Sequence, residues 1–432
     1  MLDLRYLIDN FNLVRKNCVD RNCPESVHDD LNRLVTLSER EWKPLIRTVE
    51  QIRQEQNRNA QATGKEKDST KRAELVATGK RLKLDVAEHE ENLRTLEAEL
   101  NRLLSRIPNL THPDAPIGHS EADSRELRKV GTPRAFDFEP KDHVEIGKAL
   151  DLIDFESGGK VAGHGFYFLK NDAVLLELAL QQFAMSTVVR HGYAPIITPD
   201  LARNSILEGI GFTPRGAETQ IYSVENSDLS LIGTAEITLG GMHADELLNQ
   251  ADLPLKYVGL SHCFRTEAGA AGRASKGLYR VHQFTKVEMF AFTTPETSGT
   301  MHAELLAIEE EIFTALGIPY RVLDIASGDL GGPAFRKFDL EAWMPGRGDG
   351  GEYGEVTSTS DCTDYQARRL NVRYRPADTK GTRFVHTLNG TAIALSRALI
   401  VILENYQRSD GLVDVPEVLR PYLGRDVIGA KR

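Results

Sequence analysis

Residues 31–107 carry apolar side chains at alternating steps of three and four positions, and this pattern constrains the fold more than any other feature of the chain. Charged residues fill most other positions of the segment, and its only proline is Pro44. Such spacing is the heptad pattern of a coiled coil. Two helices joined by a polar turn near residues 62–70 would form an antiparallel hairpin, with arms of about 35 residues that reach roughly 50 Å. The two apolar series are Leu31, Val35, Trp42, Leu45, Val49 and Ile52, then Leu75, Leu82, Val86, Leu93, Leu96, Leu100 and Leu103.

A cluster of basic residues lies at and beside the expected turn. It comprises Lys65, Lys67, Lys71, Arg72, Lys80, Arg81 and Lys83, and only three acidic residues interrupt it. A positive tip on a long arm favours a polyanionic partner. The alternative is a dimerisation coiled coil whose charges only face solvent. Ser38, Gly79 and His89 fall at seam positions, so we expect weak packing at those points of the hairpin.

The composition is that of a globular protein with room for two or three domains: 432 residues, 41% hydrophobic and 27% charged. No run of about 18 apolar residues predicts a membrane helix, and the first residues lack the pattern of a secretion signal. The four cysteines are scattered, which indicates reduced thiols in the cytoplasm. Cys18 and Cys23 have no second Cys/His pair, so no structural zinc is expected. The net charge of −10 argues only weakly against a nucleic-acid partner, because local patches govern binding.

Outside residues 31–107 the chain alternates short β-rich runs with helical runs, as in an α+β domain. Residues 4–18 predict one short amphipathic helix, and the proline-bearing segment 106–118 predicts a connector. From about residue 130 onward, the predicted strands are 256–264, 287–294 and 354–361, and the predicted helices are 175–192 and 301–317.

Residues 264–290, FRTEAGAAGRASKGLYRVHQFTKVEMF, combine features of a polyphosphate site. The stretch opens with Arg265 and Glu267 and closes with alternating polar and apolar residues that end in Glu288. An arginine fork matches phosphate oxygens in two-point geometry, and small residues let a backbone come close. A strand, a basic loop and a second strand can therefore hold a nucleotide polyphosphate. The loop residues concerned are Gly269, Gly272, Arg273, Lys276, Gly277 and Arg280.

Two further runs are suggestive but have ordinary explanations. Residues 231–239 contain Thr234, Ala235 and Glu236, a pattern that a helix N-cap also produces. Helix 175–192 leads into a strand with Pro199 near its end, and such strings occur in many scaffolds.

Two more runs place chemistry on predicted elements. In residues 353–369 a strand carries Glu355, followed by Thr357 and Ser358; the alternative is an edge strand with surface hydroxyls. In residues 387–407 a Gly-Thr turn is expected to enter a mostly apolar helix whose first turn carries Arg397. An unpaired buried arginine is expensive. Arg397 therefore meets either a nearby acid or a negatively charged ligand.

In order and spacing, these strings resemble the class II aminoacyl-tRNA synthetases, and most closely the bacterial-type seryl-tRNA synthetases. Residues 257–290 are similar to motif 2 of that class, 175–202 to motif 1 and 387–407 to motif 3. Thr234-Ala235-Glu236 matches the family's TxE loop. One position departs from the pattern, because Asp361 stands where the family usually has Asn.

The resemblance implies an α+β fold in two parts. Residues 1–110 would form an N-terminal tRNA-binding domain, with the coiled-coil arm over about 29–107. Residues 111–432 would form a catalytic domain built on an antiparallel sheet, with motif 1 at the interface of a homodimer.

The activity that the resemblance implies is ATP-dependent attachment of serine to tRNA(Ser) through seryl-adenylate, with tRNA(Sec) as a second candidate substrate. Arg265, Glu355 and Arg397 would be the catalytic residues. Arg265 would bind the α-phosphate and Arg397 the γ-phosphate. Glu355 would hold Mg²⁺ together with Ser358. The full expected ATP site is Arg265, Thr266, Glu267, Val281, Phe284, Glu355, Val356, Thr357, Ser358 and Arg397, with Glu267 and Phe284 on the adenine.

For serine, the implied partners are Thr234, Ala235, Glu236, Arg265, Glu288 and Thr391, with the two glutamates as candidates for the ammonium group. For tRNA, the basic cluster would grip backbone and shape rather than base edges. Two other functions stay open at this point. One is an amino-acid ligase that loads a carrier protein, although such relatives generally lack the arm. The other is an inactive RNA-binding homologue, although Arg265, Glu288 and Arg397 are all present.

Overall fold

The computed structural model describes residues 1–212, 220–267, 276–377 and 379–429. The chain divides into two compact units, Met1–Pro108 and Asn109–Arg432. Gly269, Gly272 and Arg273, expected in the polyphosphate loop, lie outside the described residues.

The first unit is entirely helical. Its helices are α1 (Leu4–Asp9), α2 (Phe11–Asp20), α3 (Glu25–Leu37), α4 (Lys43–Lys65) and α5 (Ser69–Arg106), and a π-helical turn at Ser38–Trp42 links α3 to α4. The single helix predicted over 4–18 is wrong, because the chain breaks at Asn10. There the Asn10 side chain donates to the Tyr6 carbonyl at 2.9 Å, and the Asn10 backbone leaves the helical conformation. The base of the unit has its own apolar core, in which Leu7, Val14, Leu34, Leu37, Leu103 and Ile107 are buried.

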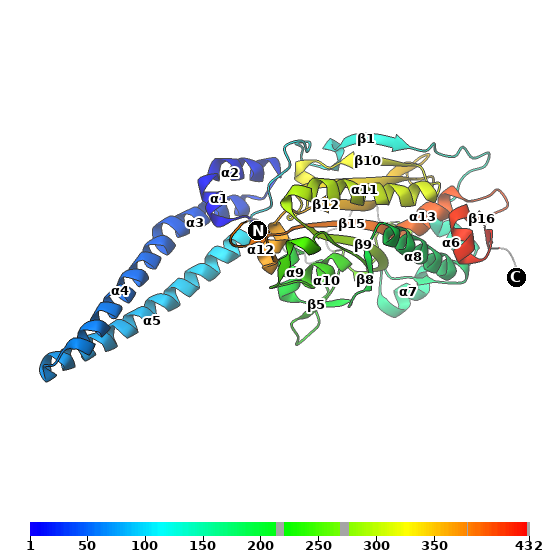
Figure 1. Ribbon diagram of the computed structural model, residues 1–432. Helices are drawn as coiled ribbons and strands as arrows, with labels where there is room; N and C mark the ends of the chain where they lie inside the picture. The colour runs from blue at the N-terminus through cyan, green and yellow to red at the C-terminus, as the bar shows by residue number, and fades with distance from the viewer. Residues whose placement is uncertain (213–219, 268–275, 378, 430–432) are drawn as a thin grey trace. The chain divides into compact units, whose positions relative to one another are not determined.

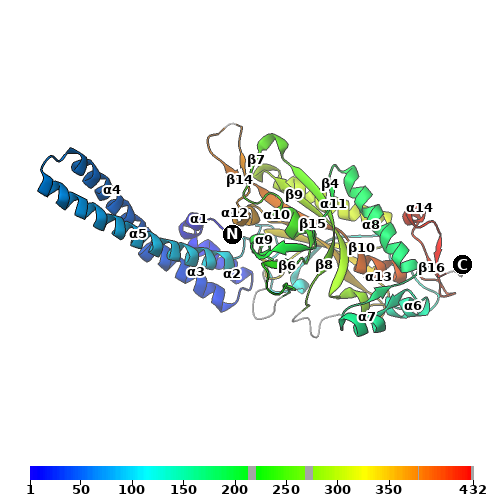
Figure 2. The same ribbon diagram turned by 90° about the horizontal axis from the view of Figure 1, so that it is seen from below.

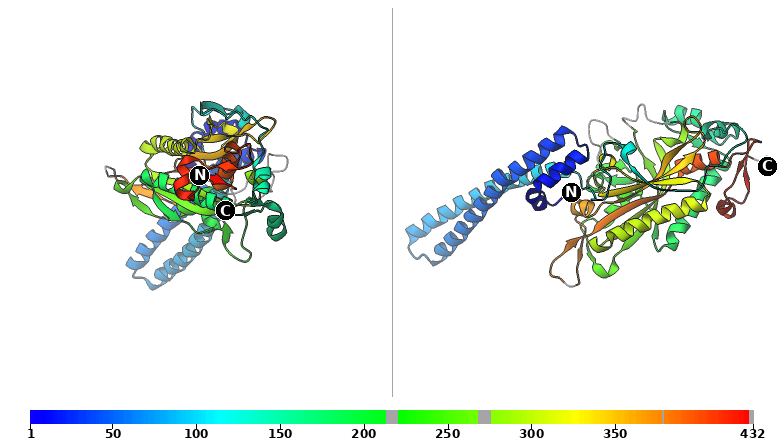
Figure 3. Two further views of the ribbon diagram at one scale, coloured as in Figure 1. Left: turned by 90° about the vertical axis from the view of Figure 1, so that its right-hand side faces the viewer. Right: turned by 90° about the horizontal axis from the view of Figure 1, so that it is seen from above.

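The predicted antiparallel hairpin is present as α4 and α5, which lie side by side along their length (Figures 1 and 3). Its turn is shorter than expected, residues 66–68, since the Asp68 carboxylate accepts from the N–H groups of Thr70 and Lys71 and starts α5 at once. At the seam the Asn59 amide donates to the Leu75 carbonyl at 2.9 Å. A Cβ on Gly79 would lie 3.0 Å from that amide nitrogen. The absence of a side chain at Gly79 thus leaves room for this hydrogen bond between the two helices, at one of the points where weak packing was expected.

The second unit is built on an eight-stranded sheet of order β1-β10-β11-β12-β15-β9-β8-β4 (Figure 1). All neighbouring pairs are antiparallel except β4 and β8, which run parallel. The strands are β1 (Arg125–Val130), β4 (Ala194–Ile197), β8 (Leu255–Phe264), β9 (Gln283–Thr293), β10 (Tyr320–Asp324), β11 (Arg336–Met344), β12 (Glu352–Asp361) and β15 (His386–Ala394). The α+β antiparallel architecture expected from the sequence is confirmed.

Helices cover both faces of this sheet. The main apolar core lies between the sheet and α8 (Asp172–Arg190), α11 (Ser298–Ala315) and α13 (Leu395–Asn405). A second core lies under α9 (Asn204–Ile210), α10 (Ala235–Gly241) and α12 (Tyr365–Leu370), which cluster together in Figure 2. Strand β9 serves both cores by alternation: Val287 and Met289 face the first, and Phe290 and Phe292 the second.

Short elements complete the unit. The small sheets pair β2 (Ile153–Asp154) with β3 (Phe168–Leu169), β5 (Leu201–Arg203) with β6 (Leu229–Leu231), β16 (Val413–Asp414) with β17 (Val427–Ile428), and join β7 (Leu247–Asn249), β13 (Arg373–Arg375) and β14 (Arg383–Phe384). The remaining helices are α6 (His143–Ala149), α7 (Phe155–Ala162) and α14 (Arg420–Leu423).

Among the described residues, α8 is the one helix whose length and composition would also suit a membrane span. Half of it is buried in the structure, where Leu176, Leu180 and Phe183 belong to the main core. Its apolar character is therefore explained by core packing.

The five strands and helices predicted after residue 130 are all present, as β8, β9, β12, α8 and α11. Two expectations for this unit are wrong. The Gly-Thr pair expected to form a turn, Gly390 and Thr391, lies inside β15, and α13 begins only at Leu395. The alternative that residues 353–369 begin with an edge strand also fails, because β12 is paired on both sides, by β11 and β15.

Candidate active site

Two cavities on one face of the large sheet share five of their lining residues, and together they form one site. The larger cavity, of about 520 Å³, is lined mainly from β9, β11, β12, β15 and the start of α10. The smaller, of about 70 Å³, is lined from β9, the middle of β12, the last part of β15, the start of α13 and the residues that follow β8. The shared residues are Arg265, Lys286, Glu355, Ser358 and Thr391.

Strand alternation and two β-bulges aim these side chains. On β9, Phe284, Lys286 and Glu288 occupy alternate positions and line the site. On β12 the register slips between the pairs Leu340–Thr357 and Glu341–Glu355, which leaves an extra residue at Val356. Strict alternation would place Thr357 beside Glu355. The bulge brings Ser358 there instead. Strand β15 has a similar shift between Thr391 and Ile393.

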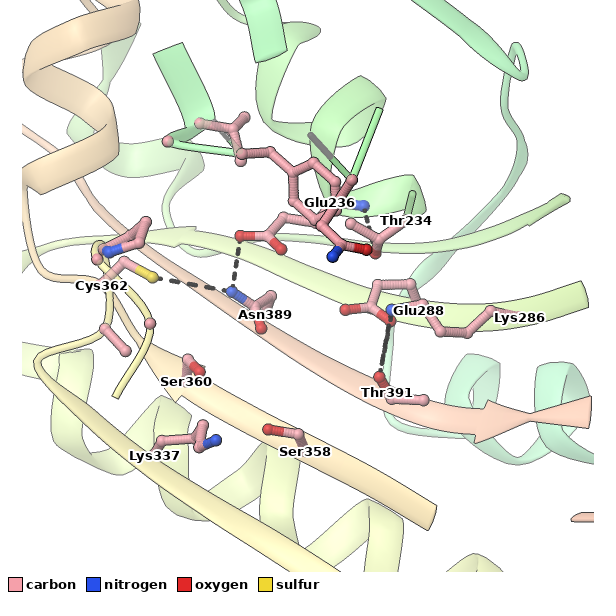
Figure 4. Close-up of a pocket in the computed structure, with 18 of the residues that line it drawn as sticks. Thr234, Glu236, Lys286, Glu288, Lys337, Ser358, Ser360, Cys362, Asn389 and Thr391 are labelled. Atoms are coloured by element: carbon pink, nitrogen blue, oxygen red, sulfur yellow. Dashed lines mark hydrogen bonds and ion pairs between the residues drawn. The ribbon is translucent and has the colours of Figure 1, made fainter. Parts of the chain in front are cut away.

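Glu236 is held at one end of the larger cavity by a set of amides. Its Oε1 accepts from Gln366 at 2.7 Å and from Asn389 at 2.9 Å. Burial, with a smaller contribution from Glu288, raises the pKa of Glu236 to about 7. Thr234 caps α10 by accepting from the Glu236 N–H, so the N-cap explanation of this pattern is true. Both residues nevertheless line the cavity (Figure 4).

A compact charged cluster stands where the two cavities meet. The Lys286 Nζ lies 2.6 Å from Glu288 Oε2, and the Thr391 hydroxyl donates to the same oxygen at 3.0 Å. Figure 4 shows the three side chains converging. The Lys286 and Glu288 side chains are only 7% and 2% exposed, so this ion pair is almost fully removed from water.

Arg265 and Arg397, which are far apart in the sequence, both line the smaller cavity. Arg265 donates to the Gly233 carbonyl and lies 5.4 Å from the centre of the Phe284 ring. Arg397 pairs with Glu355, 3.1 Å from its Oε1, and also donates to its carbonyl at 2.9 Å. The structure therefore shows the salt-bridge alternative for Arg397, and the acid concerned is itself a predicted site residue.

The Glu355 carboxylate carries its charge readily in this setting. Burial alone would raise its pKa, but Arg397 and Lys337 more than offset that effect, and the net pKa is lowered. The centre of the Tyr279 ring lies 4.7 Å from the Arg397 guanidinium.

The other expected ATP-site residues border the smaller cavity in different ways. Glu267 has a positive φ of 51° and accepts from Arg280 at 3.2 Å. Val281 is buried at the cavity wall, and Phe284 is partly exposed. Val356 is 1% exposed, and the Thr357 hydroxyl donates to the buried Glu309 on α11, so these two can face the cavity only through their backbone.

Two expected residues line neither cavity among the described parts of the chain. Ala235 is fully buried in the second core, and the Thr266 N–H donates to the Gln220 carbonyl. The seven residues of the basic cluster belong to the first unit and are all exposed.

Asp361, the departure from the family pattern, has a structural role. It is buried and accepts from the Ser298 hydroxyl and from the Thr363 N–H, each at 2.8 Å. Both partners are donors, so a carboxylate satisfies this position.

Several site residues escaped the sequence analysis. Lys286 had a visible signal, because it lies two positions before Glu288 on a predicted strand and must share its face. Tyr279, Lys337, Gln366 and Asn389 had none, since each depends on contacts between segments far apart in the chain. Lys337, for instance, lies on β11 opposite Ser360 and pairs with Asp339 at 3.4 Å.

The donor set suits Mg²⁺ when a nucleotide supplies the remaining ligands. Glu355 offers a carboxylate and Ser358 a hydroxyl at the junction of the cavities. Within the described residues no group of three His, Cys, Asp or Glu side chains could hold a metal by itself. Mg²⁺ commonly binds through one or two carboxylates plus substrate phosphates, which is what these residues allow.

Comparison with known proteins gives consistent matches over the whole chain. The model of the seryl-tRNA synthetase N-terminal domain matches residues 1–111, and that of the tRNA synthetase class II core domain (G, H, P, S and T) matches residues 220–406. The serine–tRNA ligase of Rubrobacter xylanophilus is 57% identical over all of both chains. That of Treponema denticola is 53% identical over 99% of this chain and 100% of its own.

Solved structures agree. The crystal structure of seryl-tRNA synthetase from Pyrococcus horikoshii complexed with ATP has a TM-score of 0.92 at 40% identity and covers 100% of both chains. The cytoplasmic serine–tRNA ligase from Naegleria fowleri in complex with AMP has a TM-score of 0.85 at 34% identity, covering 100% of this chain and 99% of that one.

Proposed function

Because this chain belongs to the seryl-tRNA synthetases, we propose that it activates serine with ATP and transfers the seryl group to tRNA(Ser), with tRNA(Sec) as a second candidate. The observation that carries the proposal is the pair of joined cavities. One contains two arginines and a metal-competent carboxylate, and the other contains two acids suited to an ammonium group, the buried Glu288 and the partly buried Glu236.

The first step needs no general base. The serine carboxylate is ionised at neutral pH, so catalysis consists of positioning and charge stabilisation. Arg265 would bind the α-phosphate. Arg397 would break its contact with Glu355 and bind the γ-phosphate instead. Mg²⁺, bound through Glu355 and Ser358, would neutralise charge on the pyrophosphate.

The adenine would lie between Phe284 and the C-terminal end of β8. Phe284 can stack on the ring, and Arg265 already packs against its face. Glu267 would accept from the adenine amino group once its contact with Arg280 opens. Val281, Val356 and Thr357 would border the nucleotide mainly by their backbone. Thr266, which lines neither cavity, would act only by its place between Arg265 and Glu267.

Serine would occupy the larger cavity. Glu236 and Glu288 would accept from its ammonium group, and Thr391, with Thr234, would contact its polar atoms. Ala235 would act only by starting α10. Alanine lacks the hydroxyl group and would leave the polar groups of the site without a partner, which would allow strong discrimination, of about 10⁴.

The arm would bind tRNA through its exposed basic cluster. All seven residues face solvent at and beside the turn of the hairpin, and dense positive charge on an exposed surface suits a phosphate backbone. The cytoplasmic location predicted from the cysteines fits the burial of three of the four, Cys18, Cys263 and Cys362.

We also propose a homodimer formed through α8 and β4. Strand β4 ends the large sheet, and among the described residues one of its edges has no partner strand. Ile197, the last residue of β4, is 83% exposed, and Leu178 on α8 is 54% exposed. A second copy would cover both. Ile197→Asp should lower the mass measured by light scattering from that of a dimer to that of a monomer.

The test of the function is serine-dependent exchange between ATP and pyrophosphate, followed by tRNA charging. Exchange without charging would indicate a carrier-protein ligase, and no exchange would indicate an inactive homologue. Arg53 and Glu90 face each other across the hairpin, 2.5 Å apart. Removing residues 54–89 and joining the ends with a short glycine turn should therefore leave exchange intact and abolish charging. Loss of exchange in a folded protein would contradict this division of labour.

A further inference from the structure

Lys286 is the buried cation nearest to the two acids proposed to bind serine. Its Nζ contacts the Glu288 carboxylate at 2.6 Å and donates to the Thr391 hydroxyl at 3.4 Å. Its charge also counteracts the rise in the pKa of Glu236, as a contribution smaller than burial. It is one of five residues that line both cavities.

An α-amino acid brings opposite charges into the larger cavity on one carbon atom. Its ammonium group needs an acid, and its carboxylate needs a cation, since a buried charge without a partner is costly. Glu288 and Lys286 present these two charges side by side. A zwitterion can therefore lie against the pair with each of its charges next to the opposite one.

The other cations of the site have different partners. Arg397 is held by Glu355. Lys337 lies 3.4 Å from Asp339 and 3.7 Å from Asp329. Arg265 faces Phe284 and the proposed α-phosphate position. Arg265 also lines both cavities. Lys286, however, is the cation paired with an acid proposed to bind the serine ammonium group, so it lies where the carboxylate on the same carbon atom would come next to it.

We propose that Lys286 binds the carboxylate of serine and holds it against the α-phosphate of ATP. This inference rests on the proposed function. One carboxylate oxygen forms the new bond to the α-phosphorus while the bond from that phosphorus to pyrophosphate breaks, and pyrophosphate leaves with the electron pair. No proton moves in this step. Lys286 donates to the carboxylate and so fixes the direction of attack.

The bland explanation is that Lys286 only neutralises Glu288. The two explanations differ in how tightly the enzyme should bind serinamide, which keeps the ammonium and hydroxyl groups but has no carboxylate. A lysine that binds the carboxylate favours serine over serinamide. A lysine that only neutralises Glu288 contributes equally to the binding of both ligands.

The experiment compares Lys286→Met with Lys256→Met in the full-length protein. Lys256 is a matched control on the neighbouring strand β8: it also pairs with a glutamate, Glu304 at 2.9 Å, but lines neither cavity. Dissociation constants for serine and for serinamide are measured by calorimetry, and exchange with pyrophosphate is measured in parallel.

The unchanged protein should bind serine about 100-fold more tightly than serinamide, as expected for a buried charge pair. In Lys286→Met this preference should shrink to about threefold or less, and kcat/KM for serine in exchange should fall by about 10²-fold or more. Lys256→Met should keep the full preference. Equal weakening of both ligands by Lys286→Met would overturn the inference.

Lys286→Met leaves Glu288 buried without its cation and could lower stability. Lys286→Arg keeps the charge, folds against the same acid, and should retain the preference for serine over serinamide. If Lys286→Arg loses that preference while remaining folded by circular dichroism, the inference also fails. Absence of serine-dependent exchange in the unchanged protein would instead contradict the proposed function itself.

Discussion

The hairpin arm and the lining of the larger cavity are both rich in charged residues. These residues are exposed on the arm, whereas the ion pair of the cavity is buried. On the arm the seven clustered basic residues are exposed, and the Arg53–Glu90 pair has side chains 59% and 33% exposed. In the cavity the Lys286–Glu288 pair is almost fully buried. Exposed pairs contribute about 0–1 kcal/mol each, whereas a buried charge deprived of its partner costs about 3–5 kcal/mol.

The difference indicates two kinds of work. Charges on the arm act together, over the roughly 8 Å that physiological salt allows, so single residues are replaceable. Charges in the cavity act one at a time at fixed positions, so each has a distinct role. The following substitutions test this contrast, from the largest effect to the smallest.

Arg397→Ala should lower the rate of exchange between ATP and pyrophosphate by about 10³-fold or more, because a preorganised cation at the polyphosphate is lost. Arg347 offers a matched control, since its guanidinium lies 4.5 Å from the centre of the same Tyr279 ring and it lines neither cavity. Arg347→Ala should change the rate by less than about tenfold. Similar losses in both variants would show that the ring contacts, and not the phosphate contact, matter.

Replacing Lys65, Lys67, Lys71 and Arg72 together by alanine should lower kcat/KM for tRNA by about 10²-fold at low salt. Its dependence on salt should also become shallower, while exchange stays unchanged. The control replaces Arg40, Arg47, Arg94 and Arg102, four exposed residues of the same unit that lie farther from the turn of the hairpin. Equal effects of the two sets would mean that total charge, rather than its position at the tip, governs binding.

Serine use should depend on pH through Glu236, whose pKa burial raises to about 7. The protonated acid cannot accept from an ammonium group as a charge partner, so kcat/KM for serine should fall by about tenfold for each pH unit below that value. Folding shows the opposite trend. A raised carboxyl pKa means that the folded state holds the proton more tightly, and this stabilisation is lost as pH rises toward 7. Profiles of exchange against pH, with Glu236→Gln as the flat control, would test both the pKa and the role.

Arg53→Ala should have the smallest effect, a loss of less than about 1 kcal/mol in the stability of the arm. Leu82→Ala, at a seam position that is 3% exposed, should cost about 2–4 kcal/mol. Trp42 is one of two tryptophans, so urea unfolding in a Trp343→Phe background follows the arm by fluorescence. A large loss from Arg53→Ala would break the contrast between exposed and buried charge.

Much of the site was predictable because strands and helices repeat. The alternation in β9 places Phe284 and Glu288 on one face, and Lys286 follows by the same rule. The position of Ser358 beside Glu355 was not predictable, since it depends on the bulge at Val356. Nor was the pairing of Arg397 with Glu355, which joins residues far apart in the chain.

The candidate site residues came from the resemblance to the class II synthetases. Local pattern in the amino-acid sequence determined the hairpin and the central strands. These follow from the spacing of apolar residues and from short-range capping, as at Asp68. Tertiary structure alone decided which face each hydroxyl of β12 takes, which acid each cation meets, and that Gln366 and Asn389 fix Glu236. Register shifts and buried polar networks are set by contacts between distant strands, where the energy of satisfying every buried group outweighs local preference.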